Sequence, residues 1–295
     1  SAFVGIHGST GRLVIAGDGV VQVPTTASNQ GLMLASAGPT GLATENKTFG
    51  YIEISENGTL DVKGLFNIGN ASGGKGYYGE VKQTGGTVSA GTLYVAGQST
   101  GHKYIQSGGT CTATNARIGP NTNTSGTYEL SGGTFSVADE FYVGYNGTGA
   151  LNISGTGEAV ANSTLAVGQG NGKGTVAMDG GKLVANGEVH AGVGNIGTLT
   201  VSDGDATFKK HLKLGCASGK TGKIVQTGGA VAMGQNNGSA TFPYIGYESG
   251  STGVYEISGG TFATVNTGLM LGNNGTGTFD ISGTAVVTIA GNVNL

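Results

Sequence analysis

The sequence predicts an all-β protein, built as one parallel β-solenoid (a right-handed β-helix) of about eleven coils of ~24 residues. Three observations predict this fold: a repeat of regular length, an alternation of apolar and polar residues within each repeat, and a composition dominated by glycine. Glycine supplies 61 of the 295 residues, and each glycine inside a helix costs on the order of 1 kcal/mol. Long helices are therefore excluded, whereas 37% hydrophobic residues suffice for a core.

The repeat is clearest when residues 127–149, "TYELSGGTFSVADEFYVGYNGTG", are compared with residues 254–277, "VYEISGGTFATVNTGLMLGNNGTG". The serine of the "SGG" turn, or a residue in its place, recurs eleven times, and seven of the ten intervals are 23–25 residues long. These anchor positions are Ala16, Ser55, Thr84, Ser107, Ser131, Ser154, Asp179, Ser202, Thr227, Ser258 and Ser282. Such a period is typical of repeats that bury a core only when they stack on their neighbours.

The residues before each anchor predict the first strand of the coil, because inward and outward positions alternate there. One inward column reads Leu13, Ile52, Val81, Tyr104, Tyr128, Leu151, Val176, Leu199, Ile224, Tyr255, Phe279. The next inward column reads Ile15, Ile54, Gln83, Gln106, Leu130, Ile153, Met178, Val201, Gln226, Ile257, Ile281. We expect stacked aromatic rings at Tyr104/Tyr128 and Tyr255/Phe279, and a stacked amide ladder at Gln83/Gln106.

The elements that follow the anchor complete the coil. A Gly-Gly turn leads to a short second strand such as "TFSVA", then to a third strand such as "FYVG", and the coil closes with a polar glycine turn such as "YNGTG". The three long intervals predict insertions near 21–50, 70–78 and 234–243, within one continuous solenoid over 1–295. With ~4.8 Å per coil, eleven coils would make a rod of roughly 50 Å.

The pattern of glycine turns and alternating strands in "SGGTFSVADEFYVGYNGTGALNISG" and "LMLGNNGTGTFDISG" resembles the repeat associated with type V secretion and PEP-CTERM proteins. The resemblance covers nearly the whole chain, most closely residues 79–295. It implies an extracellular or cell-surface β-solenoid of the kind found in autotransporter-like passengers, and it implies no particular activity.

Two motifs suggest chemistry at first sight. The stretch 214–222, "LGCASGKTG", looks like a phosphate-binding loop, but it occupies the closing-turn slot of its repeat and a strand follows it, so no helix N-terminus is available for phosphate. The histidines His7, His102, His190 and His211 share no repeat column, which favours surface or strand-filling roles over a metal site. We therefore expect no cofactor and no metal.

Acidic residues matter because parallel β-helices include polysaccharide lyases and glycoside hydrolases, which need paired acids on one face. Of the outward acids Glu53, Glu129, Glu256 and Asp280, only Glu256 and Asp280 are expected on adjacent coils. A solvated strand face is the preferred interpretation of this pair, so we predict that the protein is not an enzyme. An exposed tyrosine ridge is the best carbohydrate-contact hypothesis.

The two cysteines, Cys111 and Cys216, are separated by more than four coils and are expected to be free thiols, Cys111 buried and Cys216 in a turn where it could react. The net charge of −3, spread over single residues, indicates no nucleic-acid face, and no apolar run is long enough to span a membrane.

The two ends carry the functional hypothesis. The first residues match the third strand of the repeat, and the last residues stop at the same strand. The sequence thus predicts an extracellular structural protein whose subunits stack head to tail into a filament. The expected assembly interface is formed by Ala2, Phe3, Val4, Val293, Asn294 and Leu295. The alternatives are an adhesin-type passenger that binds carbohydrate or a host surface and, third, a polysaccharide lyase or hydrolase.

Overall fold

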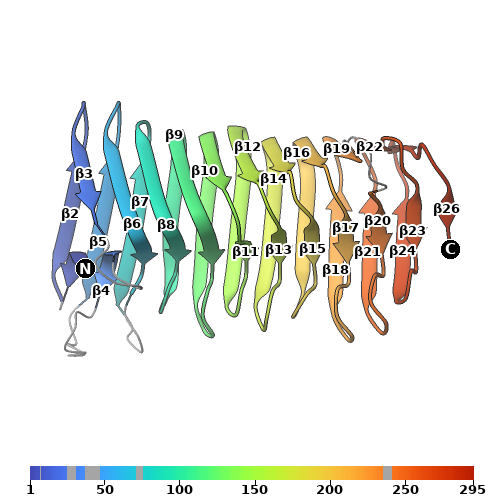
Figure 1. The fold of residues 1–295 in the computed structure, drawn as a ribbon, viewed down its shortest axis with the longest axis horizontal. Coiled ribbons are helices and arrows are strands. Elements are labelled where there is room, and N and C mark those ends of the chain that lie inside the picture. The colour runs from blue at the N-terminus through green and yellow to red at the C-terminus, as the bar shows by residue number, and fades with distance from the viewer. Residues whose placement is uncertain (7, 25–30, 37–46, 71–75, 235–240) are drawn as a thin grey trace.

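A computed structural model describes residues 1–6, 8–24, 31–36, 47–70, 76–234 and 241–295. These residues form 26 β-strands joined in one sheet, with no helix among them. Figure 1 shows the strands wound into a rod, with the N-terminus at one end and the C-terminus at the other. Every strand pairing is parallel, and each strand pairs with the corresponding strand of the next coil. The predicted fold class, an all-β parallel solenoid, is confirmed.

Each coil contributes three strand segments, which stack into three columns along the rod (Figure 1). Strands confined to the first column are β2 (Thr10–Ile15), β5 (Thr48–Ile54), β7 (Tyr77–Gln83), β18 (Thr221–Gln226), β21 (Thr252–Ile257) and β24 (Thr276–Ile281). Those confined to the second column are β3 (Val20–Val23), β19 (Ala230–Met233), β22 (Thr261–Thr264) and β25 (Val286–Thr288). Those confined to the third column are β1 (Ala2–Ile6), β4 (Gly31–Ser36), β11 (Phe141–Val143), β13 (Leu165–Val167), β15 (Val189–Ala191), β17 (Leu212–Leu214), β20 (Pro243–Ile245), β23 (Leu269–Leu271) and β26 (Val293–Asn294).

The remaining strands are longer and continue around a corner of the coil. Strands β10 (Ser125–Val137), β12 (Thr148–Ala161), β14 (Lys173–Ala185) and β16 (Gly197–Phe208) run through the first and second columns. Strands β6 (Thr59–Ile68) and β8 (Thr87–Val95) run through the second and third, and β9 (Thr100–Ile118) runs through all three.

The number of complete coils is about nine, slightly below the eleven expected from the repeat. Residues 25–30 and 235–240, which belong to two of the repeats, lie outside the described ranges. The predicted insertions near 21–50, 70–78 and 234–243 fall largely on such residues. Their described parts include β3, β4 and the start of β20.

The core is formed by the inward columns that the repeat predicted. Tyr104 aligns with Val81 on one side and Tyr128 on the other, and the same alignment continues coil by coil. The buried side chains make one continuous hydrophobic cluster along the rod. The rings of Tyr104 and Tyr128 stack with centroids 4.6 Å apart, whereas Tyr255 and Phe279 meet edge to face at 5.2 Å. Of the two predicted stacks, only the first is parallel.

The buried glutamines do not form the expected amide ladder; they bond to tyrosines instead. The hydroxyl of Tyr104 donates to Oε1 of Gln83 at 2.7 Å, and the hydroxyl of Tyr128 donates to Oε1 of Gln106 at 2.6 Å. Tyr255 donates to Gln226 in the same way, at 2.7 Å. Each glutamine Nε2 donates to backbone carbonyls of the Gly-Gly turn and of the next coil. The glutamine side chains thus bond to tyrosine hydroxyls and backbone carbonyls rather than to one another, and these bonds offset the cost of burying a polar group.

Glycines make the corner between the third column and the next coil. Gly144 ends the third strand of its coil with φ +73°, a left-handed conformation that side chains rarely adopt. A Cβ on Gly149 would lie 2.2 Å from the backbone nitrogen of Gly144, so the chain segments on both sides of the corner need glycine. This close backbone contact explains why the closing turn retains its glycines while its other residues vary.

Candidate functional site

The residues of the predicted assembly interface lie at opposite ends of the rod (Figure 1). The residues at the N-terminal end belong to β1, which pairs with β4. At the C-terminal end, Val293 and Asn294 form β26, which pairs with β23, and Leu295 follows β26. Strand alternation turns Ala2 and Val4 inward, where they pack on the core, and leaves Phe3 outward and 39% exposed. At the other end Val293 aligns with inward Leu269, whereas Asn294 aligns with outward Met270. The predicted interface therefore consists of Ala2, Phe3 and Val4 at the N-terminal end of the rod and Val293, Asn294 and Leu295 at the C-terminal end.

The last coil exposes inward-facing side chains, two of which have buried counterparts, Ile257 and Leu269, in the preceding coil. Ile281 occupies the position of the buried Ile257, yet it is 52% exposed. Val293 is 52% exposed and Leu295 is 94% exposed. At the first coil, Leu13 and Val21 are only partly buried although they point toward the core. Both end coils therefore present apolar, inward-facing side chains.

Three of the four outward carboxylates considered in the first column are bound in ion pairs with basic side chains. Glu53, Glu129 and Glu256 accept hydrogen bonds from Arg12, Lys103 and Lys223 of the preceding coil, at 2.8, 2.7 and 2.7 Å. Glu256 and Asp280 do lie on adjacent coils, as expected. Because Lys223 neutralises Glu256, this pair has the character of a solvated charged face, where single ion pairs contribute about 0–1 kcal/mol.

The stretch that resembles a phosphate-binding loop connects β17 to β18, so it lies between two strands. Cys216 within it is half-buried, and its Sγ lies 3.2 Å from the carbonyl oxygen of Lys213. Burial raises the pKa of Cys216 to about 12. The expectation of a reactive thiol is therefore wrong, because a thiol with so high a pKa is protonated at neutral pH. Both cysteines are free, as predicted, and Cys111 is fully buried.

His102 is buried at the corner of its coil. Its Nδ1 accepts a hydrogen bond from the backbone N–H of Gly79 at 2.8 Å, so the neutral ring carries its proton on Nε2, which lies 2.6 Å from Ser99 Oγ. Burial lowers the pKa of His102 to about 4, because charging the ring inside the protein is unfavourable. His7 lies outside the described residues.

We predict that His102 makes the free energy of unfolding sensitive to acid. Its pKa is about 4 in the folded protein against an ordinary 6.5, so between these values the unfolded chain binds more protons. The free energy of unfolding should therefore fall as the pH decreases from about 6.5 to about 4. Urea titrations across this range should show that the free energy of unfolding depends less steeply on pH in His102→Gln than in the wild type. His190 is present in both proteins, so the difference between them reports on His102. Identical slopes would contradict the assignment.

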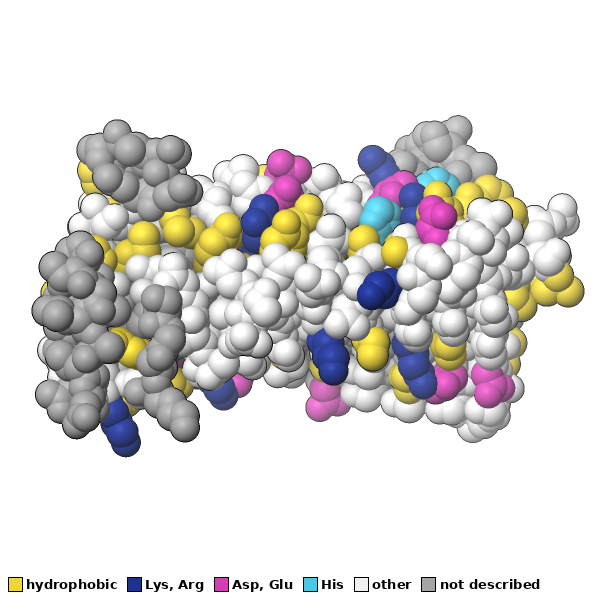
Figure 2. All heavy atoms as spheres, turned by 90° about the horizontal axis from the view of Figure 1, so that it is seen from below, with side chains coloured by type: hydrophobic (Ala, Val, Ile, Leu, Met, Phe, Trp, Pro, Cys, Tyr) yellow, Lys and Arg dark blue, Asp and Glu magenta, His cyan; other side chains and the backbone are white. Residues whose placement is uncertain are grey.

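The centre residue of each third strand points outward, and this position forms a column along the rod. It reads Phe3, Met33, Asn67, Tyr94, Arg117, Tyr142, Ala166, His190, Lys213, Tyr244, Met270, Asn294. Figure 2 shows a band of hydrophobic side chains along one face of the rod, with charged side chains gathered in groups beside it and histidines in one group. Two clusters of aromatic and charged residues occupy this outward column.

The first, the arginine cluster, comprises Tyr94, Arg117, Glu140, Tyr142 and Tyr145. The guanidinium of Arg117 forms an ion pair with Glu140 at 2.5 Å and lies over three tyrosine rings, 4.6 Å from the centroid of Tyr145, 5.5 Å from Tyr142 and 5.8 Å from Tyr94. Tyr142 and Tyr145 stack in parallel, 5.3 Å apart. Burial is the largest single influence and acts to lower the pKa of Arg117, but the hydrogen bond with Glu140 and the nearby charges of Glu140 and the tyrosines together raise it, so the guanidinium stays charged among the rings.

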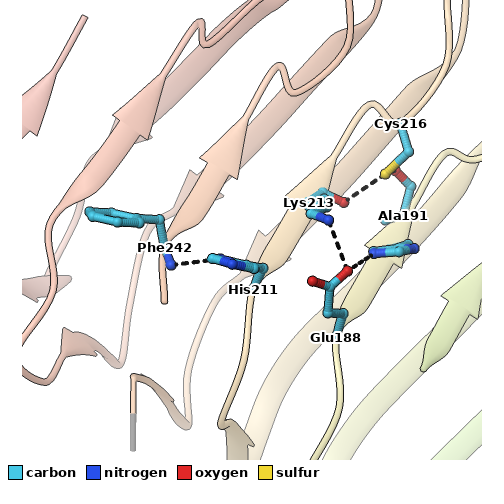
Figure 3. Close-up of polar contacts among 7 residues, drawn as sticks. Glu188, Ala191, His211, Lys213, Cys216 and Phe242 are labelled. Carbon is cyan, nitrogen blue, oxygen red and sulfur yellow. Dashed lines mark hydrogen bonds and ion pairs between the residues drawn. The ribbon is translucent and has the colours of Figure 1, made fainter. Parts of the chain in front are cut away.

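The second, the lysine cluster, comprises Glu188, His190, Lys213, Tyr244 and Tyr247; Figure 3 shows Glu188 and Lys213 pointing toward each other. One carboxylate oxygen of Glu188 lies 2.7 Å from His190 Nε2 and 2.8 Å from Lys213 Nζ. The ammonium of Lys213 also lies 4.7 Å from the ring centroid of Tyr247, and Tyr244 meets Tyr247 edge to face. Burial acts to raise the pKa of Glu188, but its hydrogen bonds to Lys213 and His190, together with the charges of these groups, give a net lowering, so the carboxylate is ionised.

The histidines extend the lysine cluster, which the sequence did not predict. Burial lowers the pKa of His190, so the ring is neutral at neutral pH. His211 Nδ1 accepts a hydrogen bond from the backbone N–H of Phe242 at 3.0 Å (Figure 3). The ring centroid of His211 lies 5.3 Å from that of Tyr244. Aligning the third strands by their centre residue would have placed His190 beside Lys213.

No family model, curated protein or solved structure matches the chain. In the part of the chain that the structure describes, no three His, Cys, Asp or Glu side chains are grouped so that they could hold a metal ion. No helix there has the length and apolar character needed to cross a membrane.

Proposed function

We propose that the protein is an extracellular structural protein whose solenoid subunits stack head to tail into a filament. The observation that carries this proposal is the state of the two end coils. Leu13 and Phe279, the first and last members of one inward column, are only partly buried, and Ile281, the last member of the next inward column, is 52% exposed. A second copy placed on the end coil would continue these columns and cover these side chains, which is a heterologous contact that does not close. The extracellular location rests on the resemblance of the repeat to surface-protein repeats.

We further propose that one strand is exchanged at the junction, and the strand pairings support this. The third column contains both β1 and β26, so it has one strand more than the first and second columns. Two copies can continue all three columns only if one of these strands gives up its place. Strand β26 is the shorter, with two residues against five, and its residues are exposed. We propose that residues 293–295 cover the edge of β23 in the free subunit and that β1 of the next copy replaces them.

Charge substitutions in the last coil test the stacking. Ile281→Glu places a carboxylate among inward-facing side chains at the junction, where burial of an unpaired charge is strongly unfavourable. We expect sedimentation velocity at high protein concentration to show filaments for the wild type and only single subunits for this variant. Thr278→Glu is the matched control, because Thr278 lies in the same strand, is exposed and alternates to the outward side.

Removal of residues 293–295 separates the proposed exchange from simple end-to-end contact. If these residues cover the edge of β23, their deletion should lower the concentration needed for assembly. Loss of assembly on deletion would overturn the exchange, and equal assembly of the wild type and Ile281→Glu would overturn the stacking.

A further inference from the structure

We propose that the outward column of the third strands binds a neutral polysaccharide chain lying along the solenoid axis, with the arginine cluster and the lysine cluster as its two subsites. This site is independent of head-to-tail stacking, because neither cluster lies in an end coil.

Each cluster combines the two kinds of surface that a sugar ring presents. Tyrosine rings offer flat apolar faces with a polar tip, which suit the C–H face of a pyranose. The ion pairs Arg117–Glu140 and Lys213–Glu188 place charged donors and acceptors beside those rings. Hydroxyl groups that bond to such charged partners gain about 1.5–3 kcal/mol per bond. The side chains are half-buried and already held in place by one another, so little ordering is needed on binding.

The charge balance selects a neutral ligand. In each cluster one cation is matched by one carboxylate, so neither cluster has an excess charge that would attract a polyanion or a polycation. The ring of His190 adds no charge at neutral pH, because burial lowers its pKa. A polyol with no charge of its own can accept from the cation and donate to the carboxylate at the same time.

The spacing of the clusters favours one long chain over two separate sugars. Arg117 and Lys213 lie in the same outward column with Tyr142, Ala166 and His190 between them, which is four coils or about 19 Å along the axis. At the middle of this span the column carries Ala166, so no bulky side chain of the column stands between the clusters at this position. A linear polymer can therefore pass over Ala166 and contact both clusters.

Two linked contacts predict a dependence on ligand length. An oligosaccharide too short to reach both clusters binds one of them, whereas a longer one makes its second contact at high effective concentration, which can raise the affinity by about 10²–10⁴. Titration calorimetry of the whole chain with neutral cello-, manno- and malto-oligosaccharides of increasing length measures this directly. We expect a steep gain in affinity at one chain length for one of the three series.

Substitutions then assign the gain to the clusters. Tyr142→Ala and Tyr247→Ala should each reduce long-chain affinity about tenfold or more, to that of the short oligosaccharides, because each removes one of two linked contacts. Tyr51→Ala is the matched control: Tyr51 is a half-buried outward tyrosine of the first column, and its replacement should leave affinity unchanged. Thermal unfolding with and without saccharide confirms that each variant is folded and reports binding separately.

Three results would overturn the proposal. These are no affinity for any of the neutral series, affinity that does not change with chain length, or affinity that survives both tyrosine substitutions. Preferential, cluster-independent binding of a polyanion such as polygalacturonate, or of a protein to this column in place of saccharide, would also overturn it.

Discussion

Replacing Phe135 with alanine should lower the free energy of unfolding by about 3–5 kcal/mol. The side chain is fully buried, and its ring stacks on Tyr128 with centroids 4.1 Å apart and meets Phe141 edge to face at 5.2 Å. Its neighbours in the column are the small residues Cys111 and Ala159. Because neither neighbour is large enough to fill the space, the cavity should remain and the full destabilisation should be measured.

Chemical denaturation followed by circular dichroism gives the test for Phe135→Ala. Thr112→Ala is the control, since Thr112 is exposed on the outward side of the adjacent coil, and its effect should stay within about 0.5 kcal/mol. A change below about 1 kcal/mol in Phe135→Ala would show that this ring is not part of the packed core.

The second large effect is expected from Gln106→Leu, which should cost about 3 kcal/mol or more. The amide accepts from the hydroxyl of Tyr128 and donates to the carbonyl oxygens of Gly109 and Thr134, both at 3.1 Å. Leucine fills the space but bonds to none of them, and each buried polar group left without a partner costs about 1–3 kcal/mol.

A double-mutant cycle shows whether the tyrosine hydroxyl is part of this cost. Tyr128→Phe in the Gln106→Leu background removes the unpaired hydroxyl, so the double variant should lose less stability than the sum of the two single variants. Gln98→Leu, at an exposed position, is the control for the change of side chain itself. Strict additivity would mean that the hydroxyl and the amide do not interact.

The fold could be predicted from the sequence because stacking converts a repeat into contacts. Once Tyr104, Tyr128 and Leu151 are aligned as one repeat position, parallel pairing places them one above the other, and the structure has this register. The same reasoning failed for the glutamines, because it considered only identical positions in adjacent coils. The tyrosine that bonds to Gln83 lies one coil later and two positions earlier, at Tyr104. The same offset links Gln226 to Tyr255, so the pattern was present in the sequence.

The two surface clusters were missed for a different reason. The outward position of the third strand varies from Ala166 to Arg117 and Tyr244, so no residue type recurs there from one repeat to the next. Its importance comes from the coils above and below, which place Glu140 beside Arg117 and Glu188 beside Lys213. Only the three-strand geometry of the coil identifies these neighbours, because the acid and its cation are 23 or 25 residues apart.

Electron microscopy of the purified protein over a range of concentrations tests the proposed function most directly. Head-to-tail stacking predicts unbranched filaments with the width of one solenoid, lengthening as concentration rises and absent in Ile281→Glu. Single rods with the length of one subunit at every concentration would contradict it.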